Sequence, residues 1–181
     1  MDAFENIVAK FLEEKGYWVR QAVKVEITKE DKRIIGTTTM PNPILDIVAF
    51  SAGDNELLLV EIKSFLDSTG VLFSGISGKN KKDAKRYKLF TNNEYREIIS
   101  ERLKDFYKNK GLINKDTIIN YALVAGKIKQ GDENNIKEYF HDRGWKLFSP
   151  QDIKDGIKDL VNRGWEDNEI TLTVKLLLKK E

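Results

Sequence analysis

The sequence contains no cysteine and only one histidine, His141. The absence of cysteine excludes a disulfide scaffold, a cysteine nucleophile and a zinc site built from thiolates. One histidine cannot build a multi-histidine metal site, and His141 is assigned no role. Candidate chemistry must therefore come from other side chains.

Long apolar runs and a strong charge imbalance are also missing. No stretch approaches the roughly 20 apolar residues that span a bilayer, and the acidic, amphipathic beginning "MDAFENIVAKFLEEKG" is unlike a signal peptide. The formal net charge is only +2, so any attraction to a polyanion must come from local clusters of basic residues. We therefore expect a cytoplasmic protein with one domain over 1–181 and enough apolar material, 40% of residues, for a core.

Apolar spacing predicts an α/β fold with a central mixed sheet and helices on both faces. Helices are predicted over 2–15, 80–91 and 94–109, and again after Asp132, after Ser149 and in the tail from 168. Strands are predicted over 17–28, 44–50, 56–64, 117–126 and 145–149, with a turn at 29–33, an extended segment to about Thr39, and a Gly- and Ser-rich loop over 68–80. The core is expected to span about 1–126, with a helical and strand extension over 127–181. Trp18, Trp145 and Trp165 each lie close to a helix-ending glycine and are expected in the core.

The stretch "LLLVEIKS" places two opposite charges in an apolar strand. Side chains alternate along a strand, so Glu61 and Lys63 share a face with Leu57 and Leu59. Apolar residues on both faces indicate a central strand, in which a charge is costly unless it is compensated. The two charged residues therefore need an explanation.

The turn "SAGDN" sets the register of the preceding strand and places Asp46 opposite Glu61. Their Cβ atoms would then lie roughly 5 Å apart on one face. Two such carboxylates repel unless one is protonated or a cation lies between them, and hard oxygen ligands suit Mg²⁺ or Mn²⁺. Lys63 adds a positive charge that can hold water or a phosphate. This combination predicts phosphodiester hydrolysis.

Asp46 after Asn-Pro, followed by Glu61-Ile62-Lys63 on the next strand, resembles the signature of the PD-(D/E)xK nuclease superfamily. The resemblance implies a restriction-endonuclease-like three-layer fold and a Mg²⁺-dependent DNA endonuclease of the restriction, repair or junction-resolving type. It implies that Asp46 and Glu61 bind the metal and that Lys63 assists catalysis. The backbone carbonyl of Ile62 would be a further ligand, and Glu5 on the first helix matches an acidic position found in many members.

A run of basic residues follows the expected site. A charged face is most often merely solvated, but this run comes after a Gly-rich loop and could contact a phosphate backbone, which positions a duplex without reading its sequence. The expected contacts, here called the basic segment, are Lys79, Lys81, Lys82, Lys85, Arg86 and Lys88. Small nucleases of this kind often act as homodimers, which is a further expectation.

Two other hypotheses fit the same residues. In the first, the chain is a catalytically inactive nucleic-acid-binding or assembly module that keeps the fold. In the second, it is an unrelated α/β protein in which Glu61 and Lys63 form a structural ion pair. An RNA substrate also remains open.

Overall fold

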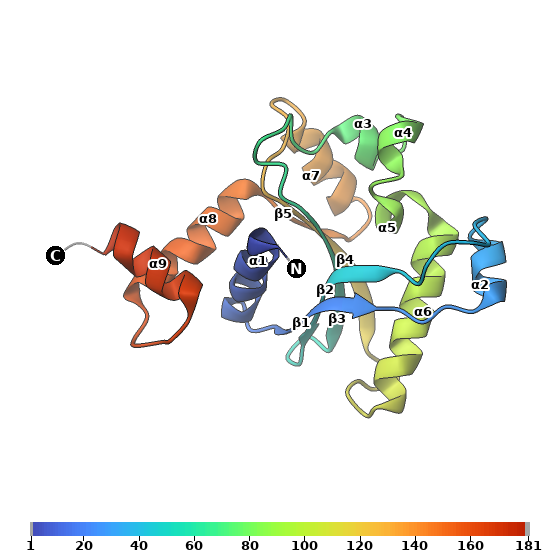
Figure 1. The fold of residues 1–181 in the computed structure, drawn as a ribbon, viewed down its shortest axis with the longest axis horizontal. Helices are drawn as coiled ribbons and strands as arrows, with labels where there is room; N and C mark the ends of the chain where they lie inside the picture. The colour runs from blue at the N-terminus through green and yellow to red at the C-terminus, as the bar shows by residue number, and fades with distance from the viewer. Residues whose placement is uncertain (1, 180–181) are drawn as a thin grey trace.

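The computed structural model describes residues 2–179 and contains a five-stranded mixed sheet (Figure 1). The strands lie side by side in the order of the sequence. Strand β2 runs antiparallel to β1 and to β3, and β4 runs parallel to β3 and to β5. Their bounds are Trp18–Lys24 for β1, Ile44–Ser51 for β2, Glu56–Lys63 for β3, Ile118–Ala125 for β4 and Lys146–Phe148 for β5. An α/β fold with a mixed sheet and helices on both faces is confirmed.

The helices divide between the two faces of the sheet. On one side lie α1 (Ala3–Glu14) and α8 (Pro150–Lys158), and on the other lie α6 (Asn93–Asn109) and α7 (Glu133–His141). The shorter elements are α2 (Lys29–Ile34), α3 (Phe73–Ile76), α4 (Lys81–Ala84), α5 (Lys88–Thr91) and the 3₁₀ helix η1 (Asp159–Asn162), and the last helix is α9 (Glu169–Leu178).

Helix α1 begins and ends where the sequence predicts. Asp2 and Glu5 form a capping box, in which each side chain accepts the backbone N–H of the other residue. Gly16 ends the helix with a φ of +86°, and the Tyr17 N–H donates to the carbonyl of Leu12. Both signals are local, so they could be read from the sequence.

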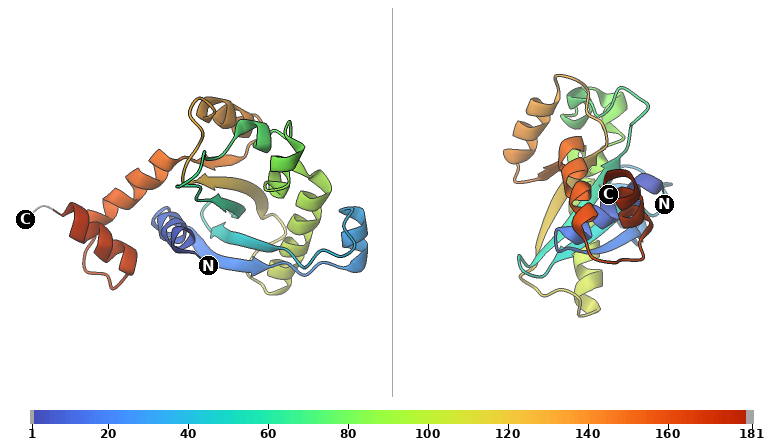
Figure 2. Two further views of the ribbon diagram at one scale, coloured as in Figure 1. Left: turned by 45° about the horizontal axis from the view of Figure 1, so that its top comes forward. Right: turned by 90° about the vertical axis from the view of Figure 1, so that its left-hand side faces the viewer.

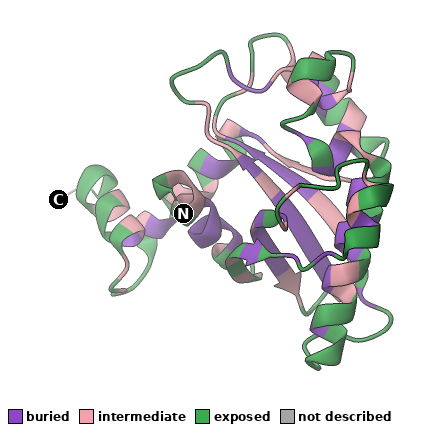
Figure 3. Cartoon of the chain, turned by 45° about the vertical axis from the view of Figure 1, so that its right-hand side comes forward, coloured by how far each residue is buried: buried purple, intermediate pink, exposed green. Residues whose placement is uncertain are grey.

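Strand β3 is buried on both faces and contributes to two cores (Figure 3). Leu57 and Leu59 pack in the cluster under α6, whereas Leu58, Val60 and Ile62 pack in the cluster under α1. The alternation predicted for this strand is therefore confirmed.

Three local predictions are wrong. The segment read as a turn and an extended strand contains α2, because Thr28 and Asp31 form a second capping box. The helix predicted over 80–91 is divided into α4 and α5, since Lys85–Tyr87 does not continue the helix, and the loop before it contains α3. Trp18 and Trp165 are 73% and 89% exposed, and only Trp145 packs against a core.

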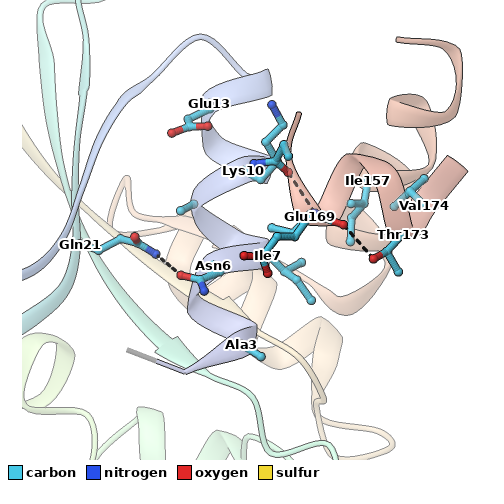
Figure 4. Close-up of a pocket in the computed structure, with 13 residues that line it drawn as sticks. Ala3, Asn6, Ile7, Lys10, Glu13, Gln21, Ile157, Glu169, Thr173 and Val174 are labelled. Carbon is cyan, nitrogen blue, oxygen red and sulfur yellow. Dashed lines mark hydrogen bonds between the residues drawn. The ribbon is translucent and has the colours of Figure 1, made fainter. Parts of the chain in front are cut away.

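The C-terminal helices α8 and α9 lead away from the sheet beside α1 (Figure 2). A cavity of about 440 Å³ lies between α1, α8 and α9, with Ile7, Ile157 and Val174 among its lining residues (Figure 4). Gly156 lets α8 approach α1 closely, because an added Cβ would lie 2.5 Å from the Phe11 ring. Within the part of the chain that the structure describes, no helix is both long and apolar enough to cross a membrane.

Candidate active site

The hairpin of β2 and β3 has the register predicted from its turn. Val48 pairs with Leu59 and Phe50 with Leu57, and the paired stretch runs to Ile47 opposite Val60. One further step places Asp46 opposite Glu61. The two carboxylates therefore come from neighbouring strands, at the point where regular pairing ends.

The sheet is distorted at Asp46. Ile47 packs in the cluster under α1, whereas Leu45 packs in the opposite cluster, so the alternation of β2 shifts between these residues. On β1 the residue across from Asp46 is Ala22, which has a φ of +50° and interrupts the pairing of the two strands. A non-glycine residue with positive φ is strained, and strained positions cluster at functional sites. Because the pairing of β1 and β2 is interrupted here, Asp46 does not occupy a regular hydrogen-bonded position in the sheet.

The side chains of Asp46, Glu61 and Lys63 meet beside this break. Asp46 Oδ2 accepts the backbone N–H of Ile62 at 2.7 Å, and Lys63 Nζ forms an ion pair with Glu61 Oε1. The Glu61 and Lys63 side chains are 20% and 19% exposed, so the pair is partly open to solvent. Asp46 thus contacts the backbone of the strand that carries the other two residues.

Burial disfavours the charged forms of both carboxylates, and the charge of Asp46 adds to this effect at Glu61. Burial raises the pKa of Asp46, while the Ile62 N–H and the Lys63 ammonium oppose that rise. Burial also raises the pKa of Glu61, against the attraction of Lys63, and the charge of Asp46 raises it further. Lys63 is therefore the main positive charge beside two carboxylates, and one lysine can neutralise only one of them.

Two tyrosines lie on the same side of the sheet. The pKa of Tyr95, in the first turn of α6, is raised to about 12 by burial and then by the charges of Glu61 and Asp46. Burial is also the main cause that raises the pKa of Tyr87 to about 12, and Glu61 contributes to it. Tyr87 is buried in the core. Tyr95 was not expected at the site, because only the tertiary fold brings α6 to this place.

The beginning of α1 approaches the same end of the sheet. At Gly126, which follows β4, an added Cβ would lie 2.4 Å from the Ser64 carbonyl oxygen and 2.9 Å from the Phe4 ring. The negative charge of Asp2 contributes to the raised pKa of Asp46. Asp2 is therefore an acidic neighbour of the site that the sequence analysis missed.

The expected metal ligands are brought together only in part. Asp46 lies close enough to Glu61 for its charge to raise the pKa of Glu61, whereas the Glu5 carboxylate accepts the Asp2 N–H in the capping box. Among residues 2–179 there is no group of three or more acidic or histidine side chains placed to hold a metal ion. Two carboxylates with raised pKa values beside one lysine nonetheless fit a divalent cation, because such an ion would relieve their repulsion with oxygen ligands of the preferred kind. Together with the Ile62 carbonyl they are the groups that could hold it.

The basic segment is exposed along its whole length. Each of its six members is exposed. Lys79 precedes α4, Lys88 begins α5, and the other four lie in α4 or in the turn after it, where the one acidic residue is Asp83. Tyr87 anchors the segment in the core, and Phe73 packs against the same core beside α7. The segment therefore presents its charge to solvent next to the carboxylates.

The cavity of Figure 4 is a separate feature. Its lining includes Asn6 and Gln21, whose side chains hydrogen-bond at 3.1 Å, but none of Asp46, Glu61 and Lys63. The carboxylate site is a separate, partly open position at the end of the β2–β3 hairpin.

Comparisons of the chain with protein-family models, with curated proteins and with solved structures give no match.

Proposed function

We propose that the protein is a Mg²⁺-dependent DNA endonuclease with a restriction-endonuclease-like fold, related to the PD-(D/E)xK superfamily. The observation that carries the proposal is the position of the Asp46 carboxylate, which accepts the Ile62 N–H and lies close enough to Glu61 for its charge to raise the pKa of Glu61, while Lys63 Nζ is bound to Glu61. The order of the elements supports it, since α1 precedes an antiparallel hairpin and α6 connects that hairpin to the parallel strand β4.

The roles of the residues follow from their surroundings. A bound Mg²⁺ supplies a Lewis acid for a phosphate group and lowers the pKa of water. Asp46 and Glu61, with the Ile62 carbonyl, would hold that ion. Lys63 lies beside them and can donate hydrogen bonds to an attacking water or to an oxygen of the scissile phosphate. The repulsion between Asp46 and Glu61, which contributes to the raised pKa of Glu61, would be relieved by a cation bound between them.

The basic segment would hold the phosphate backbone. Exposed lysines contact phosphates irrespective of sequence, and binding through them weakens as salt increases. A homodimer, in which two sites act on the two strands of a duplex, is part of the proposal. Light scattering on the protein with and without DNA would test that assembly.

A cleavage assay tests the function. Wild type and the variants Asp46→Asn, Glu61→Gln and Lys63→Met are incubated with duplex, single-stranded and branched DNA and with RNA, in Mg²⁺ or in a chelator. The proposal requires Mg²⁺-dependent cutting by wild type that each variant loses. Cutting that persists in Asp46→Asn and Lys63→Met would remove the assigned site.

The contacts at the site also favour a second function. The Asp46 carboxylate is already bonded to the Ile62 N–H, and Glu61 is already paired with Lys63. Such partnered charges suit a non-catalytic module that binds nucleic acid or organises an assembly. A gel shift of DNA without cutting under any metal condition would favour this alternative.

A further inference from the structure

A second, polar cavity of about 440 Å³ lies on the α6 side of the sheet and has not been assigned a role above. Its walls come from α5, the beginning of α6, the end of α7 and the residues before β5. The lining residues are Ser77, Gly78, Phe90, Thr91, Asn93, Arg96, Tyr139, Arg143 and Trp145, which include no acidic side chain.

Two arginines give this cavity a positive charge. The guanidinium carbon of Arg96 lies 5.0 Å from the centre of the Trp145 ring, and that of Arg143 lies 5.8 Å from it. Asn93 holds Arg96 by a hydrogen bond of 2.7 Å, and the Tyr139 carbonyl accepts from Arg143 at 3.0 Å. In the described part of the chain neither guanidinium forms an ion pair, so both retain their charge for a ligand.

The cavity also contains aromatic surface and an unused hydroxyl. Trp145 and Tyr139 are partly exposed, and the guanidinium of Arg143 stacks on Tyr139 with 3.6 Å between its carbon and the ring centre. Ser77 Oγ is buried and has no hydrogen-bond partner among residues 2–179. Because that oxygen is closed to solvent, a ligand in the cavity would bond to it only after the Ser77 side chain turned towards the cavity.

The size and chemistry of the cavity fit a nucleotide. Its volume lies in the range of about 300–1,000 Å³ that is usual for organic ligands and far exceeds the volume of a bare phosphate ion. Guanidinium groups bind phosphate through paired hydrogen bonds, and aromatic rings bind bases by stacking. An unpaired nucleotide presents both groups, whereas a duplex hides its base faces.

The basic segment connects this cavity to the carboxylate site. Ser77 and Gly78 precede the segment and Phe90 and Thr91 follow it, so cavity residues flank it at both ends. Within the segment, Tyr87 lies close enough to Glu61 for that charge to raise its pKa. A strand that passes over the segment would thus reach the cavity from the carboxylates.

We propose that this cavity binds one nucleotide of an unpaired strand, with its phosphate at Arg96 and Arg143 and its base against Trp145. The substrate would accordingly be DNA with a single-stranded end or branch. The link to cleavage rests on the proposed function, but nucleotide binding does not.

Fluorescence of Trp145 tests the binding directly. In a background with Trp18→Phe and Trp165→Phe, the protein is titrated with thymidine 5′-monophosphate, with thymidine and with inorganic phosphate. We expect saturable quenching by the nucleotide, and an affinity at least tenfold lower for Arg143→Gln and for Arg96→Gln. Arg33→Gln removes the same charge from exposed α2 and should bind like wild type. Circular dichroism shows whether each variant is folded. If Arg96→Gln does not fold, Arg143→Gln, which lies at an exposed position, still tests the binding.

Several results would overturn the inference. These are an absence of saturable quenching, equal affinity in Arg143→Gln and wild type, or saturation by phosphate or thymidine alone at the same concentration as the nucleotide. Asp46→Asn separates this inference from the proposed function, because it should bind the nucleotide but not cut DNA. If wild type cuts DNA but does not bind the nucleotide, only the cavity assignment falls; if it binds but never cuts, only the nuclease falls.

Discussion

Strand β3 carries two glutamates, and each forms an ion pair with a lysine. Glu56 begins the strand and pairs with Lys146 of β5, while Glu61 lies near its end and pairs with Lys63. Residue type and partner type are the same. The two surroundings nevertheless differ, and this difference separates a structural charge from a candidate functional one.

The Glu56 pair is well satisfied. The carboxylate also accepts hydrogen bonds from Asn120 at 3.0 Å and from Tyr17 at 3.4 Å, and Tyr17 in turn accepts from Lys146 at 2.9 Å. Burial lowers the pKa of Lys146, but its bonds to Glu56 and Tyr17 outweigh that effect, so the pKa is raised. Every charge here has a partner, which is typical of a stabilising network.

The Glu61 pair carries one negative charge too many. Asp46 adds a second carboxylate to the same face, and the pKa values of both acids are raised. A protein gains no stability from such an arrangement in the absence of a cation, so a functional reason for it is the simpler explanation.

The largest expected contrast between the two glutamates is in catalysis. Glu61→Gln and Lys63→Met should each reduce Mg²⁺-dependent DNA cleavage by about 10³-fold, a rise in barrier of about 4 kcal/mol, because they remove a ligand or the group that positions water and phosphate. Glu56→Gln should leave the rate per folded molecule unchanged. Initial rates at saturating Mg²⁺ measure this. Equal losses of cleavage rate in Glu56→Gln and Glu61→Gln would show that the two glutamates do not differ in function.

Stability should show the reverse order. Glu56→Gln leaves Lys146 without its carboxylate and should lower the free energy of unfolding by about 2–3 kcal/mol. This is at or below the lower limit of the roughly 3–5 kcal/mol for a broken buried pair, because Lys146 is 33% exposed. Urea unfolding followed by circular dichroism checks it. The double variant with Lys146→Met should recover part of the loss, and no recovery would mean that the pair is not the cause.

A smaller effect is expected at Asp46. Asp46→Asn removes one of two repelling carboxylates and keeps an oxygen that can accept the Ile62 N–H, so it should stabilise the metal-free protein by about 1 kcal/mol at pH 7. The same unfolding experiment in a chelator measures it. A clear loss of stability would show that the charge of Asp46 supports the fold, contrary to the comparison.

The smallest effect is the pH dependence of that gain. The folded pKa values of Asp46 and Glu61 are raised above their ordinary values of 3.8 and 4.5, so their ionisation costs stability above the folded pKa, and the cost disappears as pH falls through it. The advantage of Asp46→Asn over wild type should therefore shrink from pH 7 towards pH 4. If the stability advantage of Asp46→Asn grew as the pH fell, the pKa of Asp46 would be lowered in the folded protein and not raised.

The predictable parts of this molecule are those fixed by local pattern. The turn at 51–55 determines the register of β2 and β3 as far as Ile47 and Val60, which the sequence predicts, whereas the shift in the alternation of β2 at Asp46 was not predicted. The capping box Thr28-x-x-Asp31 was equally local, and it was missed because the basic run after it resembles a turn.

Other features depend on distant contacts and could not be predicted. The helix predicted after Asp132 is present, but the Asp132 carboxylate does not cap it and instead accepts the Phe73 N–H at 2.8 Å from another part of the chain. Trp18 lies on the edge strand and points to solvent, which its apolar character does not reveal. The proximity of Tyr95 to Glu61 likewise arises only when α6 packs on the sheet.

Calorimetric titration of Mn²⁺ into the protein tests the central claim most directly. The account predicts saturable binding by wild type and by Glu133→Gln, a carboxylate removed from an exposed ion pair on α7, and loss of binding in both Asp46→Asn and Glu61→Gln. Absence of binding by wild type, or binding that survives in Asp46→Asn and Glu61→Gln, would show that the two carboxylates and Lys63 form no cation site.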